Sequence, residues 1–448
     1  MYRFGTYVLN RFFYTAFIRL LSPGLLVWMA ARARRSGGVW DVWSGARFGR
    51  YEQPSPLSNP VWIHAVSLGE TRAAQPLIQS LLDQGKRVLL THMTATGRAE
   101  GARAFATAIQ EGRVAQEWLP YDFPGSTRRF IEHYRPCVGV LIEREIWPNL
   151  IASARKAGIP MMLVSARFSD RALHQSLRAG SVMRQAYAGF QAVYAQTLHD
   201  AQRLEQAGAS AVRVSGNFKF DVSLPAGKIK RGREFAAALP RKVVTIASTR
   251  EGEDEMFVRA IKRQLRRTCG GDQSLSERVL FCIIPRHPQR FDEAAALLEK
   301  AGLSYVRRST LIEAGDSSTT ALQLCANANV LLGDTLGEMA WYYAVSQVAI
   351  VGGSFAPLGG QNFIEACAVG VPVLVGPHTR NFEQAVVDAV DEGAAVRMPN
   401  AEAAVQRALQ LLEEPQRLTR MGEAGSHWVQ KHAGAVARVV AGLSEIKR

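Results

Sequence analysis

The segment that constrains the fold most is residues 348–382, which read as a strand, a glycine-rich loop, a short helix and a second strand. Residues 348–351 are apolar, four glycines follow, and Gly370 precedes a second apolar run at 371–375. Glycine commonly ends a helix, and two buried strands joined by a helix form a parallel crossover. The loop amides then face the carboxyl edge of the sheet and can bind an anion. The glycines can also simply make a tight turn, because the loop lacks a Walker lysine and a clean GxGxxG.

The same alternation of strands and helices runs through the rest of the chain. In the first half, Glu70, Glu143 and Lys219 each come just after a predicted strand. A polar, basic stretch punctuated by proline and glycine, residues 223–241, separates this half from a second series of strands and helices. The pattern predicts two α/β domains, each with a doubly wound parallel sheet. The charged residues after the strands can face a ligand, or they can be solvated or form structural ion pairs.

Glu70 has two possible roles. It stands three residues after Ser67, and serine and glutamate at this spacing form a capping box, so Glu70 can simply cap its own helix. It can also be a general base, because substrates bind at the carboxyl ends of strands in such sheets. The helix dipole favours the ionised carboxylate, whereas a general base gains from a pKa nearer neutrality. Burial in a closed cleft could offset the dipole.

The second half carries a candidate nucleotide site. Arg286 and Glu338 each follow a predicted strand, and Asn362 and Glu365 begin the short helix with capping-box spacing. An arginine and helix amides suit a phosphate, and a carboxylate suits ribose hydroxyls. We therefore expect these residues to meet at one edge of the second sheet. The simpler alternatives are a surface arginine and a glutamate that only caps its helix.

Composition narrows the class of protein and its partners. The 448 residues, 47% of them hydrophobic, suggest a globular protein of two or three domains. The net charge of +15 makes a polyanionic partner plausible: nucleic acid, an acidic membrane face or a phosphorylated substrate. The five cysteines include no CxxC pair, which argues against a zinc site or a disulfide framework and fits a reducing compartment. The sequence contains no DxD and no HExxH, so it predicts no metal site.

The first forty residues are basic and apolar, with no acidic side chain before Asp41. The longest uncharged run, residues 20–31, is shorter than the roughly 20 residues of a transmembrane helix. A helix lying in the membrane plane fits better, because its arginines can meet anionic headgroups. If it spans, the basic cluster at 32–35 places the following part in the cytoplasm. A secretory signal and an amphipathic helix packed on its own domain are the alternatives. The arginines of this segment are Arg3, Arg11, Arg19, Arg32, Arg34 and Arg35.

Seven sequence blocks together resemble a known family. In chain order they are WIHAVSLGE, LPYDFP, EREIWPN, GNFKFD, PRHPQRF, DTLGE and GGQNFIEA. Their order and spacing resemble those of the Kdo (3-deoxy-D-manno-octulosonic acid) transferases that modify lipid A precursors in Gram-negative bacteria. The resemblance implies a GT-B glycosyltransferase, in which two Rossmann-like domains face a cleft. The implied parts are a membrane-associated helix at 1–35, an acceptor domain at 36–225 and a CMP-sugar domain at 226–448.

The resemblance also implies roles for individual residues. Glu70 would be the proton acceptor of an inverting transfer, and Glu143 and Lys219 would stabilise its transition state. The residues implied to contact CMP follow three strands of the second domain: Pro285, Arg286, Leu336, Gly337, Glu338, Asn362, Phe363, Ile364 and Glu365. No cofactor and no metal are expected, because cations and helix amides can absorb the negative charge of the leaving CMP.

The implied substrates are CMP-Kdo and a tetraacylated lipid A precursor, lipid IVA. The implied location is the cytoplasmic face of the inner membrane, with the anionic membrane surface as partner and no nucleic acid.

The chain departs from the family pattern at a few positions. Gln361 stands where the family usually has histidine, and Ala65 and Phe363 replace other small or apolar residues. Two other functions stay open: a related nucleotide-sugar enzyme with a UDP donor, such as another glycosyltransferase or an epimerase, and a membrane-surface protein that only binds a nucleotide. A dehydrogenase is disfavoured, because no strand leads into GxGxxG with an acidic residue about 20 positions later.

Overall fold

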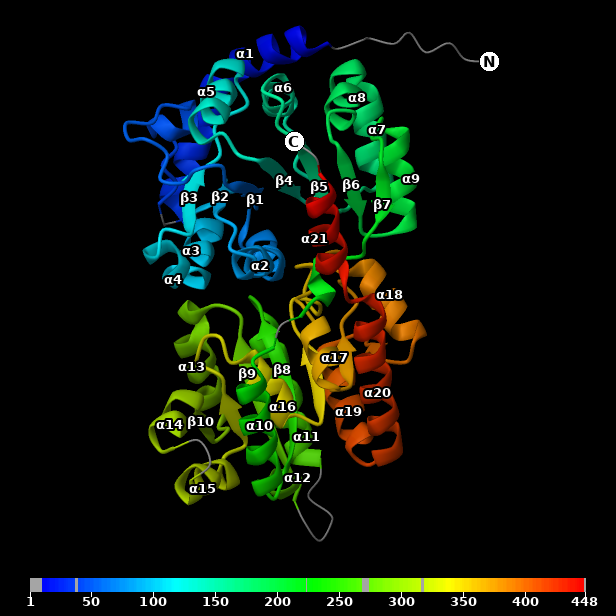
Figure 1. Cartoon of the computed structure of the whole chain (residues 1–448). Coiled ribbons are helices and arrows are strands. Elements are labelled where there is room, and N and C mark those ends of the chain that lie inside the picture. Colours follow the sequence, from blue (N-terminus) through cyan, green and yellow to red (C-terminus); the bar gives the residue numbers. More distant parts are fainter. Residues whose placement is uncertain (1–9, 37–38, 223, 268–273, 316–317, 447–448) are drawn as a thin grey trace. The chain divides into compact units, whose positions relative to one another are not determined.

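The computed structural model describes residues 10–36, 39–222, 224–267, 274–315 and 318–446 (Figure 1). Arg3, predicted to face the membrane, lies outside these ranges. The chain divides into two compact units: Met1–Asp221 with His432–Arg448, and Val222–Lys431. Each unit holds one seven-stranded sheet whose paired strands are all parallel. The predicted doubly wound α/β class is therefore confirmed.

In the first unit the strand order is β3-β2-β1-β4-β5-β6-β7. The strand β1 (Val61–His64) pairs with β2 (Val88–His92) on one side and with β4 (Val138–Ile142) on the other, so the order reverses between β1 and β4. Ligands of α/β sheets bind at the carboxyl ends of the strands beside such a reversal. The other strands are β3 (Val114–Trp118), β5 (Met161–Ala166), β6 (Ala192–Ala195) and β7 (Val212–Val214).

Helices cover both faces of this sheet (Figure 1). Side chains alternate along a strand, so Trp62 of β1 enters one core with Phe130, whereas Ile63 enters the other core with Leu77. This double burial explains why central strands such as β4 are apolar throughout. After β1 come α2 (Leu68–Asp83), α3 (Ala95–Ala104), α4 (Ala106–Gln110), α5 (Pro124–Tyr134), α6 (Pro148–Lys156), α7 (Asp170–Ala179), α8 (Ser181–Tyr187), α9 (Leu198–Gln206) and the 3-10 turn η2 (Phe218–Phe220).

The second unit repeats the architecture with the order β10-β11-β9-β8-β12-β13-β14, which reverses between β8 and β12. Its strands are β8 (Lys242–Thr249), β9 (Val279–Pro285), β10 (Tyr305–Arg307), β11 (Val330–Leu332), β12 (Val348–Val351), β13 (Val373–Val375) and β14 (Ala395–Arg397). Its helices are α10 (Ala226–Ala238), α11 (Glu253–Arg267), α12 (Leu275–Arg278), α13 (Phe291–Ala301), α14 (Arg308–Glu313), α15 (Thr319–Asn327), α16 (Met339–Val345), α17 (Ile364–Val369), α18 (Glu383–Asp391), α19 (Ala401–Leu412) and α20 (Pro415–His432).

The last helix, α21 (Ala435–Glu445), belongs to the first unit. Val436 and Val439 enter the same core as Ile63. The carboxylate of Asp221 accepts the backbone N–H groups of Gly434 at 2.5 Å and Val436 at 2.7 Å. The sequence prediction assigned residues 226–448 to one domain, but 432–448 group with the first unit because α21 buries its apolar face there.

The N-terminal helix α1 (Arg11–Ser36) continues through Pro23 and exposes most of its apolar side chains. Its segment Arg11–Arg35 is long and apolar enough to cross a membrane by length and composition, and its most apolar window is only 6% buried. The sequence prediction, which counted only the uncharged run 20–31, favoured a helix in the membrane plane; the longer helix is compatible with either arrangement. Such a helix near an N-terminus is weak evidence of membrane association.

A buried aspartate attaches α1 to the rest of its unit. Asp122, in the LPYDFP block, accepts the Tyr14 hydroxyl at 2.9 Å and the backbone N–H groups of Asn149 at 3.0 Å and Leu150 at 2.8 Å. The Thr15 hydroxyl donates to the Asn149 side chain at 3.1 Å. The start of α6 and the N-terminal helix α1 thus share one carboxylate.

We expect Asp122→Ala to lower the melting temperature and to loosen α1, because three buried donors would lose their acceptor. Buried donors left without a partner cost about 1–3 kcal/mol. Tyr14→Phe removes one of the three bonds and should cost about 1 kcal/mol. Thermal unfolding and amide exchange in detergent measure both effects. Unchanged exchange at residues 11–36 in both variants would show that Asp122 does not hold α1.

Candidate active site

Glu70 lies in the first turn of α2, directly after β1 and beside the reversal of strand order. The predicted capping box with Ser67 is present. One oxygen, Oε2, accepts the backbone N–H groups of Val66 at 2.6 Å and Ser67 at 3.1 Å. Among the described residues, no donor is bonded to the other oxygen, Oε1. One oxygen therefore caps the helix, while the other can accept a proton.

The pKa of Glu70 is shifted toward neutrality. Burial, the largest cause, and the neighbouring Glu143 and Glu145 carboxylates raise the pKa of Glu70 to about 8, while the N–H bonds from Ser67 and Val66 oppose the rise. Burial thus outweighs the helix start, which was expected to keep the pKa low. A carboxylate with a pKa near the working pH is well matched to general-base catalysis.

Glu143 and Lys219 meet at the same edge. The Lys219 Nζ lies 3.7 Å from the Glu143 Oε1, and both side chains are mostly buried. Glu143 directly follows β4 and has φ of 61°, a left-handed conformation that strains a residue with a Cβ. Lys219 sits in η2 between Phe218 and Phe220, which are both buried. Of the residues predicted from sequence, Glu70, Glu143 and Lys219 are therefore brought together by one sheet edge.

Two further residues at this edge carry no role in the sequence analysis. Glu145 accepts the Trp147 indole N–H at 2.9 Å, and the His64 Nε2 lies 4.0 Å from its Oε2. Burial lowers the pKa of the fully buried His64 to about 3, so its ring is neutral. The Nδ1 of His64 lies 3.1 Å from the Thr91 carbonyl oxygen and 3.0 Å from the Thr91 hydroxyl, so Thr91 offers this nitrogen both an acceptor and a donor.

Burial also raises the pKa of Glu145, and Glu143 adds to the rise. The edge is thus an acidic cluster in which neighbouring carboxylates help to raise the pKa values of Glu70 and Glu145. The sequence signal for His64 was weak: a histidine in a fully apolar strand, next to the strand end that leads to Glu70.

The second unit has a buried glutamate after its first strand. Glu253, at the start of α11, is fully buried and accepts four backbone N–H groups. Three come from the glycine-rich loop after β12: Gly353 at 2.6 Å, Phe355 at 2.8 Å and Ala356 at 3.2 Å. The fourth is the N–H of Arg250 at 2.8 Å. The sequence analysis missed this residue, although an acid just after a strand was the available signal.

The candidate nucleotide residues after β9 and β12 lie together. The Arg286 Nε donates to the Gln361 Oε1 at 3.2 Å. Gln361, which stands where the family usually has histidine, therefore contacts the arginine that is predicted to bind the phosphate. The Asn362 side chain donates to Glu365 at 2.9 Å and accepts the N–H of Ile364 at 3.2 Å. The helix α17 starts two residues after Asn362, with Phe363 at its N-cap. Asn362, just before this short helix, therefore pairs with Glu365 in its first turn.

The loop after β11 carries the remaining candidates. Leu336 is exposed, and Gly337 has a positive φ of 77°. Glu338 accepts from the buried Arg308 at 3.0 Å and from the Thr335 hydroxyl at 2.8 Å. Arg308 also stacks on Trp341, 3.7 Å from the ring centre. Glu338 is thus fixed by protein contacts, and any ribose hydroxyl would have to bind a carboxylate that already has an arginine partner.

Within the described ranges, no group of three His, Cys, Asp or Glu side chains is placed to hold a metal ion. The metal-free chemistry expected from the sequence stays a prediction.

The chain is similar to known glycosyltransferases over most of its length. Residues 44–222 match the family described as 3-Deoxy-D-manno-octulosonic-acid transferase (kdotransferase), and residues 316–428 match Glycosyl transferases group 1. A 3-deoxy-D-manno-octulosonic acid transferase of Bordetella pertussis is 54% identical over 98% of this chain and 99% of its own length. The protein of that name from Haemophilus influenzae is 28% identical over 96% and 97%.

Among solved structures, UDP-GlcNAc 2-epimerase from Neisseria meningitidis bound to UDP-GlcNAc superposes with a TM-score of 0.56. The superposition covers 86% of this chain and 100% of the epimerase chain, with 15% sequence identity. At this identity the similarity shows only that the two proteins share a fold.

The raised pKa of Glu70 predicts a pH-dependent effect of removing its charge. The folded pKa lies above the unfolded value, so the contribution of this group to stability falls as the pH rises from about 5 to about 8. Glu70→Gln cannot ionise and keeps an acceptor for the capping bonds. Its melting temperature relative to the wild type should therefore rise over this pH range.

Glu70→Ala is the matched control. It loses the cap as well and should be destabilised by about 1 kcal/mol at the acidic end. Scanning calorimetry at both ends of the range measures the differences. A constant difference for Glu70→Gln would contradict the raised pKa.

Glu253→Gln should loosen the loop at residues 352–356, because an amide NH2 group would face backbone N–H groups that now meet a carboxylate oxygen. The expected loss is about 1–3 kcal/mol for the buried donors left unpaired. Amide exchange of the loop is the measurement. Glu255→Gln, on the exposed face of the same helix, is the control and should leave exchange unchanged; the same protection in both variants would refute the role of Glu253.

Proposed function

The chain belongs to the 3-deoxy-D-manno-octulosonic acid (Kdo) transferase family, and from this premise we propose that it moves Kdo from CMP-Kdo to a tetraacylated lipid A precursor, lipid IVA, with inversion at the anomeric carbon. The protein is a glycosyltransferase of the GT-B fold, as the sequence predicted. The observation that carries the reaction is Glu70, whose raised pKa and unbonded Oε1 suit a general base.

In this mechanism Glu70 removes the proton from an acceptor hydroxyl through Oε1. The oxygen then attacks the anomeric carbon of Kdo as the bond to CMP breaks. The capping bonds to Oε2 hold the carboxylate in one orientation throughout, which lowers the entropic cost of reaching the transition state. General-base assistance of this kind contributes about 100- to 10,000-fold to the rate.

Glu143 and Lys219 have electrostatic roles in the proposal. The anomeric carbon gains positive charge in the transition state, and the Glu143 carboxylate can stabilise it. Lys219, paired with Glu143 at 3.7 Å, can hold the donor carboxylate or the leaving phosphate. The strained backbone of Glu143 supports a functional role, because such conformations cluster at active sites.

CMP is assigned to the second unit, to Pro285 and Arg286, to residues 336–338, and to residues 362–365. The contact of Arg286 with Gln361 supports a shared phosphate site. The positive charge of Arg286 and the loop amides would absorb the charge of the leaving CMP without a metal ion.

The membrane-facing helix α1 is assigned to the cytoplasmic face of the inner membrane. Arg34 and Arg35 stand in its last turn, its exposed face carries Phe12, Phe17 and Trp28, and both features suit an anionic bilayer surface. The net charge of +15 also suits an acceptor that bears phosphates.

The reaction is tested by incubating purified protein with CMP-Kdo and lipid IVA and weighing the lipid by mass spectrometry. The wild type should add one or more Kdo units, and Glu70→Gln, which keeps the helix cap, should lose about 100- to 10,000-fold of the rate. The wild-type rate should rise with pH as Glu70 loses its proton near its pKa of about 8.

Parallel reactions with a UDP-sugar in place of CMP-Kdo test the alternative donor. Unmodified lipid with CMP-Kdo would refute the proposed donor and acceptor. Equal rates for the wild type and Glu70→Gln would reduce Glu70 to a helix cap.

A further inference from the structure

A groove in the first unit is separate from the residues assigned to the reaction. It has a volume of about 420 Å³, and ligand pockets usually have volumes of about 300–1,000 Å³. Its walls come from α6, from α8 with the loop after it, and from the first turn of α1. These three helices contact one another, and Figure 1 shows them at the same end of the unit.

The floor of the groove is apolar. Four buried residues form it: Pro148 and Ile151 of α6, and Val182 and Ala186 of α8. Each pair is three or four residues apart and therefore lies on one face of its helix. Gly189, after α8, lets the two walls approach closely, because a Cβ there would lie 2.5 Å from the Ile151 Cγ2. The floor is thus packed in place before any ligand binds.

The rim of the groove is cationic. Arg11, Arg155 and Lys156 line it, and all three side chains are exposed. Its lining includes no aspartate and no glutamate, and within the described part of the chain none of these three cations pairs with a carboxylate. Arginine and lysine bind phosphate oxygens by charge-assisted hydrogen bonds. A cationic rim above an apolar floor suits a ligand that joins a phosphate to a hydrocarbon chain.

The groove lies beside the exposed apolar side chains of α1. Phe12 and Phe13 directly follow Arg11, and both are exposed. The Tyr14 hydroxyl, one turn after Arg11, donates to Asp122, so the first turn of α1 is attached to the unit. Aromatic side chains of a helix in the bilayer surface enter the boundary between headgroups and acyl chains. With α1 placed in this way, Arg11 and the groove lie at the depth of the lipid phosphates.

The cationic end of the groove is far along α6 from the acidic edge. Glu143 and Glu145 precede α6, whereas Arg155 and Lys156 stand in its last turn. A helix of nine residues is about 13 Å long. A phosphate at this end of α6 is therefore separated from the acceptor hydroxyl that reacts at Glu70.

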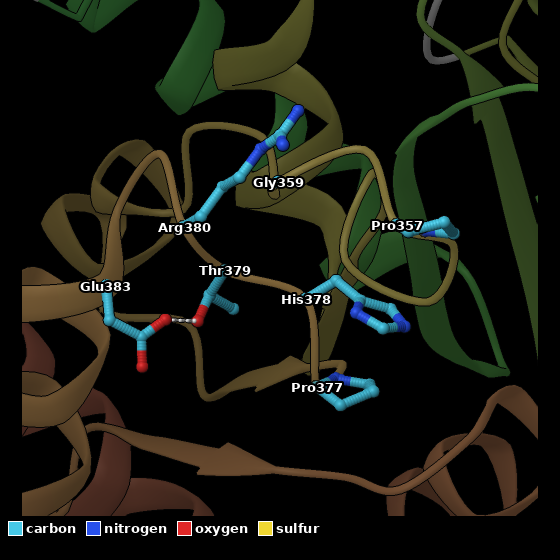
Figure 2. Close-up of a pocket in the computed structure, with 7 residues that line it drawn as sticks. All are labelled: Pro357, Gly359, Pro377, His378, Thr379, Arg380 and Glu383. Carbon is cyan, nitrogen blue, oxygen red and sulfur yellow. Dashed lines mark hydrogen bonds between the residues drawn. The ribbon is translucent and has the colours of Figure 1, made fainter.

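The smaller pocket of the second unit offers no comparable site. It has a volume of about 280 Å³, and Figure 2 shows a carboxylate on its lining, that of Glu383, bonded to the Thr379 hydroxyl. Its wall includes Gly359, in the loop that leads to Asn362, so it borders the residues already assigned to CMP.

We propose that the groove of the first unit binds one anionic glycerophospholipid of the membrane. The lipid phosphate lies at Arg11, Arg155 and Lys156, and the glycerol with the first acyl carbons lies along the apolar floor. The inference rests on the membrane placement in the proposed function and names the class of lipid that serves as partner. The bound lipid holds the unit to the bilayer at a second point beside α1. General attraction between a chain of net charge +15 and an anionic surface requires no such site.

The test counts the lipids that full-length protein retains in neutral detergent, by native mass spectrometry. Phosphatidylglycerol and the zwitterionic phosphatidylcholine, with the same acyl chains, are the probes, and the wild type should retain one phosphatidylglycerol in preference. The double variant Arg155→Gln with Lys156→Gln should bind it about tenfold or more weakly, as expected when hydrogen bonds to a charged group are lost. Ala152→Trp, which fills the groove without changing the charge, should also weaken binding. Thermal unfolding checks that each variant is folded.

Lys86→Gln with Arg87→Gln is the matched control. It removes the same two residue types from an exposed pair that precedes β2 and lies outside the groove lining. This variant should retain phosphatidylglycerol as the wild type does. Inorganic phosphate in excess should not displace the lipid, because it cannot contact the apolar floor.

Any of five outcomes would overturn the lipid site. Unchanged binding in the groove variants would remove its residues, equal weakening by both double variants would leave only general charge attraction, and equal retention of phosphatidylcholine would exclude recognition of the anionic headgroup. Displacement by inorganic phosphate would indicate a site for the free ion, and displacement by lipid IVA would assign the groove to the acceptor. A protein that retains phosphatidylglycerol but transfers no Kdo would instead refute the proposed reaction, so the two failures are distinct.

Discussion

The backbone N–H groups that follow the first strand of each sheet must find acceptors, and in both units a glutamate supplies them. Glu70 follows Ser67 by three residues, Glu253 follows Arg250 by three, and each accepts the N–H of the residue three positions earlier. Buried donors without acceptors are costly, so this contact fixes the turn from strand to helix at the reversal of strand order. In the second unit both oxygens of Glu253 are occupied by four amides, and the residue is structural. In the first unit the amides occupy only one oxygen of Glu70. The same local device therefore leaves a proton acceptor in one unit and anchors a glycine-rich loop in the other.

The acidic edge of the first unit shows what a buried carboxylate such as Glu70 costs in folding stability. Burial is the largest cause of the raised pKa values of Glu70 and Glu145, and the Glu143 carboxylate adds to both. A stability-optimised edge would separate these carboxylates or pair each with a cation. Glu143 lies 3.7 Å from Lys219, and Arg144 acts on Glu145, but the pKa values of Glu70 and Glu145 stay raised. Neutral His64 adds no positive charge, because burial keeps its pKa near 3. Keeping Glu70 buried beside two other carboxylates therefore lowers folding stability, and it also brings the pKa of Glu70 to about 8.

The sequence predicted the central strands because they are short apolar runs, whereas edge strands with polar residues, such as β3, β10 and β14, were not predicted. It also placed Glu70, Glu143 and Lys219 after strands, and parallel topology then brings such positions to one edge. Contacts between residues far apart in the chain were not predictable in this way. Glu253 bonds a loop about a hundred residues later, Arg308 occupies Glu338, and α21 returns to the first core. Local sequence patterns do not indicate these long-range contacts. Asn362 and Glu365 have the spacing of a capping box, but α17 starts one residue later than that spacing requires, and the two side chains bond to each other instead.

The contacts that attach α1 to its unit also reach the acidic edge, through α6. Asp122 receives the first amides of α6 and the Tyr14 hydroxyl of α1, and the Asn149 side chain donates to the Asp122 carbonyl at 2.7 Å and accepts from Thr15. The segment just before α6 contains Glu143, Glu145 and Trp147, so its far end is fixed by the same contacts that hold α1. A helix seated in the bilayer surface would therefore fix not only the depth of the unit but also the end of the loop that surrounds the base. The LPYDFP block, which contributes no charged group to the acidic edge, has a physical function in this arrangement: its buried aspartate joins α1 to the loop that carries Glu143 and Glu145.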